Sequence, residues 1–284
     1  MTHAVRFAAV IALFWGLSGC LQFEEATVLM PDGSGKLMLI IGLAKDKATE
    51  GMGDLETPDP EDLEKDMEGI VAWAEVKKEE KGDMVWVTLA GYFDDINKVK
   101  WWEKKQPGGG EEEGGGGGME PPMPKAAERK LMLGFEHKKG STELVVTNGM
   151  RDELAKTAKE PEGESDEAKK MAEEMIKKML EGFKFTLSVT VPGDVKPAKG
   201  FETSGRKASL VIDEKLILDA MAGKEEAKKK MEAMPAKATL AWEKTTVSDA
   251  DVAAFQKELA AVKEKWKTMR GEWKKKAAEK KKEK

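Results

Sequence analysis

A stretch of nineteen residues, QPGGGEEEGGGGGMEPPMP (106–124), interrupts this chain of 284 residues. It holds eight glycines and four prolines, so it has too few apolar side chains to form a buried strand or helix. We therefore expect a disordered linker there. The same order of elements (two strands, an amphipathic helix and a further strand) is expected on both sides of it. This order suggests a weak internal repeat, although the two halves align poorly.

Before the linker, runs of apolar residues bounded by turn residues predict three strands. They cover 21–30, 36–43 and 84–93. We expect the second to be buried on both faces. A helix starting near Pro60 is expected between the second and third strands, because apolar residues recur there at helical spacing. These residues are Leu63, Met67, Ile70, Val71 and Ala74. A short helix capped by Asp94 is expected within 94–102.

After the linker, the same reasoning predicts five more strands and two helical stretches. The strands cover 128–137, 141–148, 183–192, 207–213 and 236–247, and the helices cover 168–179 and 214–233. Within 183–192, phenylalanine, leucine and valine alternate with polar residues, which is typical of a half-buried strand. The fold class expected is α+β, with a mainly antiparallel sheet of about six to eight strands packed against amphipathic helices.

A long helix is expected at the C-terminus, within residues 248–284. Ser248 and Asp251 have the spacing of a capping box. Apolar residues then follow at alternating spacings of three and four, the pattern of a heptad repeat. This helix face consists of Val252, Phe255, Leu259, Val262, Trp266, Met269 and Trp273.

The same helix ends in a lysine-rich tail. From Lys257 onward the chain has 12 basic and 5 acidic residues. Three interpretations stay open. The helix can dock on its own sheet, pair with a partner protein or a second copy as a coiled coil, or place its basic segment on anionic lipid headgroups.

The N-terminus has the layout of an export signal. An apolar run follows Arg6 and is too short to cross a bilayer as a helix. Leu17, Ser18, Gly19 and Cys20 then resemble the bacterial lipobox, in which diacylglycerol is attached to the cysteine before cleavage. The resemblance implies a signal peptide at 1–19 and a domain at 20–247 that begins at a lipid-modified Cys20. It also implies a membrane partner and a place in the bacterial cell envelope, on the outer membrane or the outer face of the inner membrane.

Several chemistries are not expected. Cys20 is the only cysteine, and it would be used for lipid attachment, so disulfides and cysteine zinc sites are not expected. A serine triad would need His137, which we expect on the surface at the end of a strand. GSGK (33–36) lacks the first glycine and the Ser or Thr of a P-loop, so Gly33 and Gly35 are interpreted as hairpin glycines.

Acid–base catalysis by carboxyl groups and nucleic-acid binding are also not expected. None of the 53 acidic residues lies in an apolar stretch that would raise its pKa. Five arginines and few base-stacking aromatic residues argue against a nucleic-acid partner. Trp101 and Trp102 suit a sugar platform or a membrane-facing edge, but a core-packing or helix-end role is the simplest interpretation. The sequence thus predicts no enzyme, no catalytic residue, no cofactor and no metal site.

Two stretches resemble LppM-like bacterial lipoproteins. CLQFEEATVLMPDGSGKLMLIIGL (20–43) is similar to their opening, with an anchored cysteine, a strand, a D-G-x-G turn and a second strand. FTLSVTVPGDVKPAKGFETSGRKASLVID (185–213) is similar to a later part, although the tryptophan expected after Gly205 is absent. The resemblance implies an α+β domain similar to lipid-binding helix-grip folds, with no catalytic motif. The function expected is a lipid-anchored protein that binds a partner protein or an apolar ligand. A helix-mediated scaffold and, less favoured, an acid-based envelope hydrolase are the alternatives.

Overall fold

The computed structural model describes residues 21–45, 63–64, 67–102, 131–149, 174, 176–178 and 180–282. The expected signal peptide and the linker 106–124 lie outside these residues. So does most of the helix expected at 168–179, of which residues 174 and 176–178 are helical.

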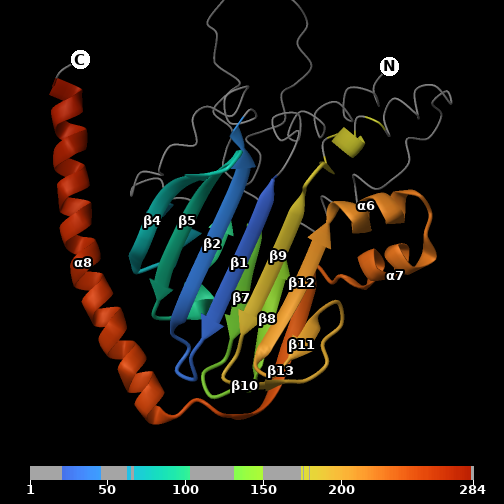
Figure 1. Ribbon diagram of the computed structural model, residues 1–284. Coiled ribbons are helices and arrows are strands. Elements are labelled where there is room, and N and C mark those ends of the chain that lie inside the picture. The colour runs from blue at the N-terminus through green and yellow to red at the C-terminus, as the bar shows by residue number, and fades with distance from the viewer. Residues whose placement is uncertain are drawn as a thin grey trace, which may run out of the picture.

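The larger of two sheets has seven strands and forms one face of the molecule (Figure 1). In spatial order the strands are β11 (Glu202–Ser204), β12 (Lys207–Asp213), β9 (Lys184–Thr190), β1 (Gln22–Leu29), β2 (Gly35–Ala44), β5 (Met84–Phe93) and β4 (Ala72–Lys81). Neighbouring strands are antiparallel except β1 and β9, which run parallel with Gln22 beside Lys184.

A second sheet lies behind the first and has six antiparallel strands. Its order is β10 (Gly193–Val195), β13 (Lys237–Thr245), β8 (Glu143–Asn148), β7 (Leu131–His137), β6 (Lys100–Trp102) and β3 (Met67–Glu68). Each sheet takes strands from both sides of the 106–124 segment. The expected α+β class and the mainly antiparallel pairing are confirmed, but there are two sheets instead of one.

The core lies between the two sheets. Alternate residues of β9 and its flanks face it, and Phe185, Leu187 and Val189 are at most 3% exposed. Phe23 of β1 stacks on Phe185 at 5.4 Å between ring centroids, and on Trp101 of the second sheet at 5.1 Å. Trp101 is therefore a core-packing residue, as its simplest interpretation predicted. β2 was expected to be buried on both faces, but it is buried mainly on one.

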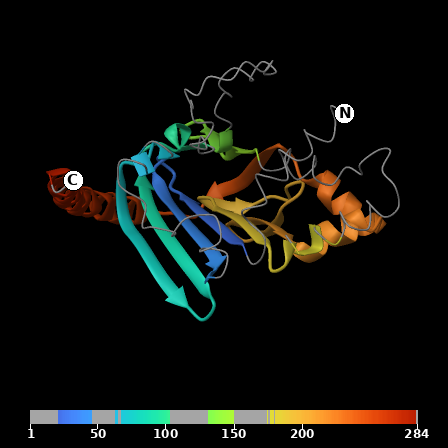
Figure 2. The ribbon, with the colours of Figure 1, turned by 90° about the horizontal axis from the view of Figure 1, so that it is seen from above.

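Three helices occupy the periphery of the described chain (Figures 1 and 2). They are α6 (Glu214–Met221), α7 (Glu225–Ala233) and α8 (Asp249–Lys282). α6 and α7 lie beside the β12 side of the larger sheet, whereas α8 lies beyond β4 on the other side. Both regions were expected to be helical.

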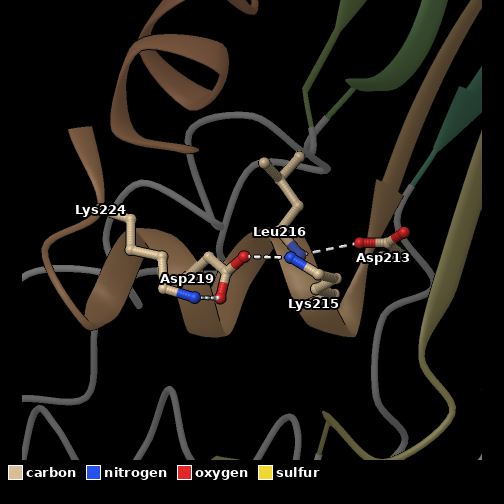
Figure 3. A network of polar contacts seen from close by, with 5 residues as sticks. All are labelled: Asp213, Lys215, Leu216, Asp219 and Lys224. Carbon is tan, nitrogen blue, oxygen red and sulfur yellow. Dashed lines mark hydrogen bonds and ion pairs between the residues drawn. The ribbon is translucent and has the colours of Figure 1, made fainter. Parts of the chain in front are cut away.

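Side-chain hydrogen bonds cap two of these helices. Asp213 accepts from the Leu216 backbone N–H at 2.8 Å and starts α6 (Figure 3). Asp219 of the same helix pairs with Lys215 and Lys224. At α8 the expected capping box is present, because the Asp251 N–H donates to Ser248 Oγ at 3.2 Å and the Ser248 N–H donates to Asp251 Oδ2 at 3.0 Å.

The helix expected from residue 60 to 74 is wrong in its second half. Residues 63 and 64 are helical, but 67–68 form β3 and 72–81 form β4. Pairing decides the outcome, because β4 forms a hairpin with β5 around Gly82, which has a φ of +59°. A ladder of this length outweighs a local helical pattern. The helix expected at 94–102 is a 3₁₀ turn, η1 (Ile96–Lys98), capped by Asp95 and followed by β6.

Candidate functional site

The predicted lipid-attachment residues Leu17, Ser18, Gly19 and Cys20 lie outside the described residues. The residue after Cys20 already belongs to the larger sheet, since the Lys184 N–H donates to the Leu21 carbonyl at 3.0 Å. The Leu21 side chain packs against Leu43 and Val85. The strand pairing therefore starts immediately after the predicted attachment site, with no spacer.

We call this part of the molecule the Leu21 end of the sheet. β1 and β9 begin there, while β2 ends there, with Ala44 beside Met84 of β5. The opposite end carries the turn between β1 and β2. Figure 1 shows that α8 runs from the opposite end toward the Leu21 end, so its C-terminus and the start of β1 lie at the same end of the molecule.

The predicted apolar face of α8 contacts the chain's own sheet. Phe255 and Leu259 are 3% exposed and pack with Tyr92 of β5, whose ring stacks on Phe255 at 5.8 Å. Trp266 is 6% exposed and contacts the edge of Trp273 at 6.0 Å. The other members of the face are half-buried, namely Val252, Val262, Met269 and Trp273.

Polar contacts fix where α8 lies along the sheet. Glu258 accepts from Tyr92 Oη at 2.5 Å and pairs with Lys36 Nζ at 2.7 Å. These two hydrogen bonds, that from Lys36 first, lower the pKa of the Glu258 carboxyl. Further along, Arg270 Nη2 pairs with Glu64 at 2.8 Å. Each pair is partly exposed and is worth at most about 1 kcal/mol, so together they mainly set the register of the helix.

One acidic residue contradicts the expectation that no carboxyl lies in an apolar environment. Glu25, in the middle of β1, is 1% exposed and is flanked in the ladder by Leu39 and Leu187. Burial raises its pKa to about 8, although a hydrogen bond from Thr27 Oγ1 at 3.1 Å acts in the opposite direction. The sequence carries the signal, because Glu25 has the strand parity of Phe23, which faces the core.

His137 was expected on the surface, but it is buried. It is 7% exposed, its Nδ1 donates to the Glu143 carbonyl at 2.8 Å, and its ring lies 5.8 Å from that of Trp242. His137 ends β7 on the face that Phe135 also occupies, so strand alternation turns it inward. In a serine triad, a carboxylate accepts a hydrogen bond from Nδ1 and so orients the histidine ring. In His137 a main-chain carbonyl takes the place of that carboxylate.

The two glycines of the GSGK stretch are structural, as predicted. Gly33 has a φ of +89° in the turn between β1 and β2. Gly35 opens β2, where an added Cβ would lie 2.0 Å from the Val28 carbonyl oxygen and 2.4 Å from the Phe93 ring. Close packing of strands therefore explains Gly35, and backbone conformation explains Gly33.

Within the described ranges, no three His, Cys, Asp or Glu side chains are grouped as metal ligands. In the same part of the chain, none of the helices combines the length and the apolar character needed to cross a bilayer.

Comparison with known proteins gives little further information. No protein-family model matches the chain, and no curated protein matches its sequence. Among solved structures, the folded domain of LppM from Mycobacterium tuberculosis, determined by NMR, is 8% identical with a TM-score of 0.34. That alignment covers 80% of this chain and 92% of the LppM domain. The likeness is distant, and the function proposed below rests on the chain's own residues.

Proposed function

We propose that this chain is a lipid-anchored protein of the bacterial cell envelope whose α+β domain acts without catalysis, by binding a partner protein or an apolar ligand at the membrane surface. The observation that carries the proposal is the position of Leu21. It follows the predicted attachment site Cys20 directly, and its carbonyl is already bonded to Lys184 of β9.

The missing spacer has a consequence for where the domain works. One residue of extended chain spans at most about 3.6 Å. A lipid on Cys20 would therefore hold the Leu21 end of the sheet close to the headgroups. The domain would be presented to molecules at or in the membrane surface.

The anchor is tested by metabolic labelling with an alkyne fatty acid in a bacterial host. The wild type should take up the label and Cys20→Ala should not, because the thiol is the attachment point. Ser18→Ala is the matched control, since it keeps a small residue before the cysteine and should label like the wild type. Equal labelling of the wild type and Cys20→Ala would refute the anchor.

The nature of the bound molecule is a separate question. Native mass spectrometry of protein extracted from membranes distinguishes the two options. A mass above that of the lipidated chain that disappears on denaturation would identify an apolar ligand. A mass equal to that of the lipidated chain would favour a protein partner, to be sought by crosslinking in intact cells.

The alternatives have less support. Self-association through the apolar face of α8 is not proposed, because Phe255, Leu259 and Trp266 are already buried against the chain's own sheet. An acid-based hydrolase would need a carboxyl that substrate can reach. Glu25 has a raised pKa, but it is 1% exposed inside the core.

A further inference from the structure

We propose that the last turns of α8, residues 274–282, form a binding surface for the anionic headgroups of a membrane. The proposal builds on the lipid anchor, because it assigns a second contact to the membrane that the anchor would reach. It follows from three features of α8: its direction, its length beyond the sheet and its charge.

The direction of α8 is set by contacts along its length. Gln256, near the start of α8, donates to Asp32 Oδ2 at 2.8 Å. Asp32 lies in the turn between β1 and β2, at the end of the sheet opposite Leu21. Phe255 and Glu258 contact Tyr92, which is also toward that opposite end of β5. From there the helix passes beside β4 toward the Leu21 end (Figure 1). Its C-terminus therefore points to the side where a lipid on Cys20 would be.

The helix is long enough to leave the sheet behind. Arg270 is bonded to Glu64, and Trp273 contacts Trp266 edge to face. The helix continues to Lys282, nine residues past Trp273, which corresponds to about 13 Å of further rise. Of the lysines in this last part, Lys275 is exposed.

The charge of this segment has one sign. Residues 274–282 contain six lysines and one glutamate. At the turn between β4 and β5, also at the Leu21 end, the lysines are paired with acidic residues: Lys81 with Glu79 at 3.0 Å and Lys45 with Glu80 at 2.8 Å. A cluster of lysines on a helix end next to a membrane attracts anionic lipid, and the attraction grows with each lysine near the surface. Trp273, directly before the cluster, suits the interface between headgroups and acyl chains.

The experiment measures binding to vesicles without the covalent lipid. The protein used is the chain from residue 20 with Cys20→Ser, which holds every residue that the structure describes. Its co-sedimentation is measured with two kinds of vesicle: phosphatidylcholine alone, and phosphatidylcholine mixed with the anionic phosphatidylglycerol. We expect binding to the mixed vesicles only, weakening as salt is added, because salt screens exposed charges.

Two matched variants locate the surface. Replacing Lys275, Lys276, Lys280 and Lys281 with glutamine should weaken binding at least about tenfold. The control replaces the same number of exposed lysines near the opposite end, Lys196, Lys199, Lys207 and Lys244, with glutamine and should bind like the parent. Circular dichroism and thermal unfolding of both variants verify the fold.

Two results would overturn the proposal. One is equal binding to both kinds of vesicle, and the other is equal loss of binding in the two lysine variants. Neither depends on the anchor, because Cys20→Ser removes it from the assay. Conversely, a failure of the fatty-acid labelling would refute the anchor and leave the vesicle result unaffected.

Discussion

Glu25 is an ionisable group in a position that strands normally give to an apolar residue. It lies on the inward face of β1 between Leu39 and Leu187, and its carboxyl has a pKa of about 8 instead of 4.5. In the unfolded chain the carboxyl ionises near its ordinary pKa, whereas in the folded chain it keeps its proton up to about pH 8. Folding is therefore opposed progressively more as the pH rises from about 4.5 to about 8.

This difference predicts a pH-dependent stability that Glu25→Gln removes. At about 1.4 kcal/mol for each pH unit between the two pKa values, the wild type should lose on the order of 5 kcal/mol between pH 4.5 and 8. The loss saturates at higher pH, where both states are ionised. Glutamine can still accept from Thr27 and has no proton to lose. Urea unfolding at pH 5, 7 and 9 measures the slope.

The neighbouring Glu24 is the matched control for this measurement. It belongs to the same strand and is exposed. Glu24→Gln should therefore keep the wild-type dependence on pH. A Glu25→Gln variant whose stability falls with pH as steeply as that of the wild type would show that Glu25 is not the group responsible.

Gly35 is constrained by space, so Gly35→Ala should destabilise the protein. An added methyl group would overlap the Val28 carbonyl oxygen at 2.0 Å and the Phe93 ring at 2.4 Å. We expect a loss of about 3 kcal/mol in the free energy of unfolding, at the upper end of ordinary overpacking, because one of the two neighbours is backbone. Gly82→Ala is the comparison, since nothing lies within 4 Å there and only the positive φ opposes alanine, at about 1–2 kcal/mol. Equal losses would contradict the steric explanation.

At the scale of single elements, α8 should depend on its aromatic contact with the sheet. Phe255 is 3% exposed and stacks on Tyr92, so Phe255→Ala should cost about 3–5 kcal/mol, in global stability or in the local docking of the helix. Faster amide exchange in residues 249–273 would identify local undocking. The control is Val252→Ala, which changes a half-buried residue of the same face and should cost less than about 1.5 kcal/mol.

The local sequence pattern was sufficient to predict some helices and strands and insufficient to predict others. α8 was predictable because its cap and its apolar face are both encoded within one continuous stretch, and β9 because Phe185, Leu187 and Val189 alternate. β4 was not predictable in the same way, since its conformation depends on pairing with β5. The two-sheet arrangement was likewise not predictable, because local sequence patterns do not indicate which strands pair across the 106–124 segment.

The candidate site was predictable to a similar extent. The sequence alone indicated Cys20 and the basic tail of α8 as separate features. That Leu21, the residue after Cys20, and the C-terminus of α8 lie at one end of the molecule follows from the strand order and from the contacts of α8. These contacts join residues more than two hundred positions apart, such as Gln256 and Asp32. The burial of Glu25 and of His137 follows from strand parity, and could have been inferred.

At the scale of the whole molecule, the two halves around 106–124 should not fold separately. β1 and β2 of the first half pair with β9 of the second, and β6 pairs with β7 across the segment. Neither residues 21–105 nor residues 125–284 contain a complete sheet. Expressed alone, each should lack a cooperative unfolding transition, and mixing them should restore one. Cooperative unfolding of either half alone would contradict this view.

The parallel pairing of β1 with β9 also bears on when the protein can fold. β1 lies nearest the predicted anchor and is among the first parts of the chain to be made, yet its partner begins at Lys184. Pairings between segments so distant in sequence form slowly, because a long loop must close before any contact is gained. An exported chain would thus keep one edge of its first hairpin open until most of its length had crossed the membrane. During that interval the strand beside the lipid would be accessible to chaperones, to proteases and to other nascent chains.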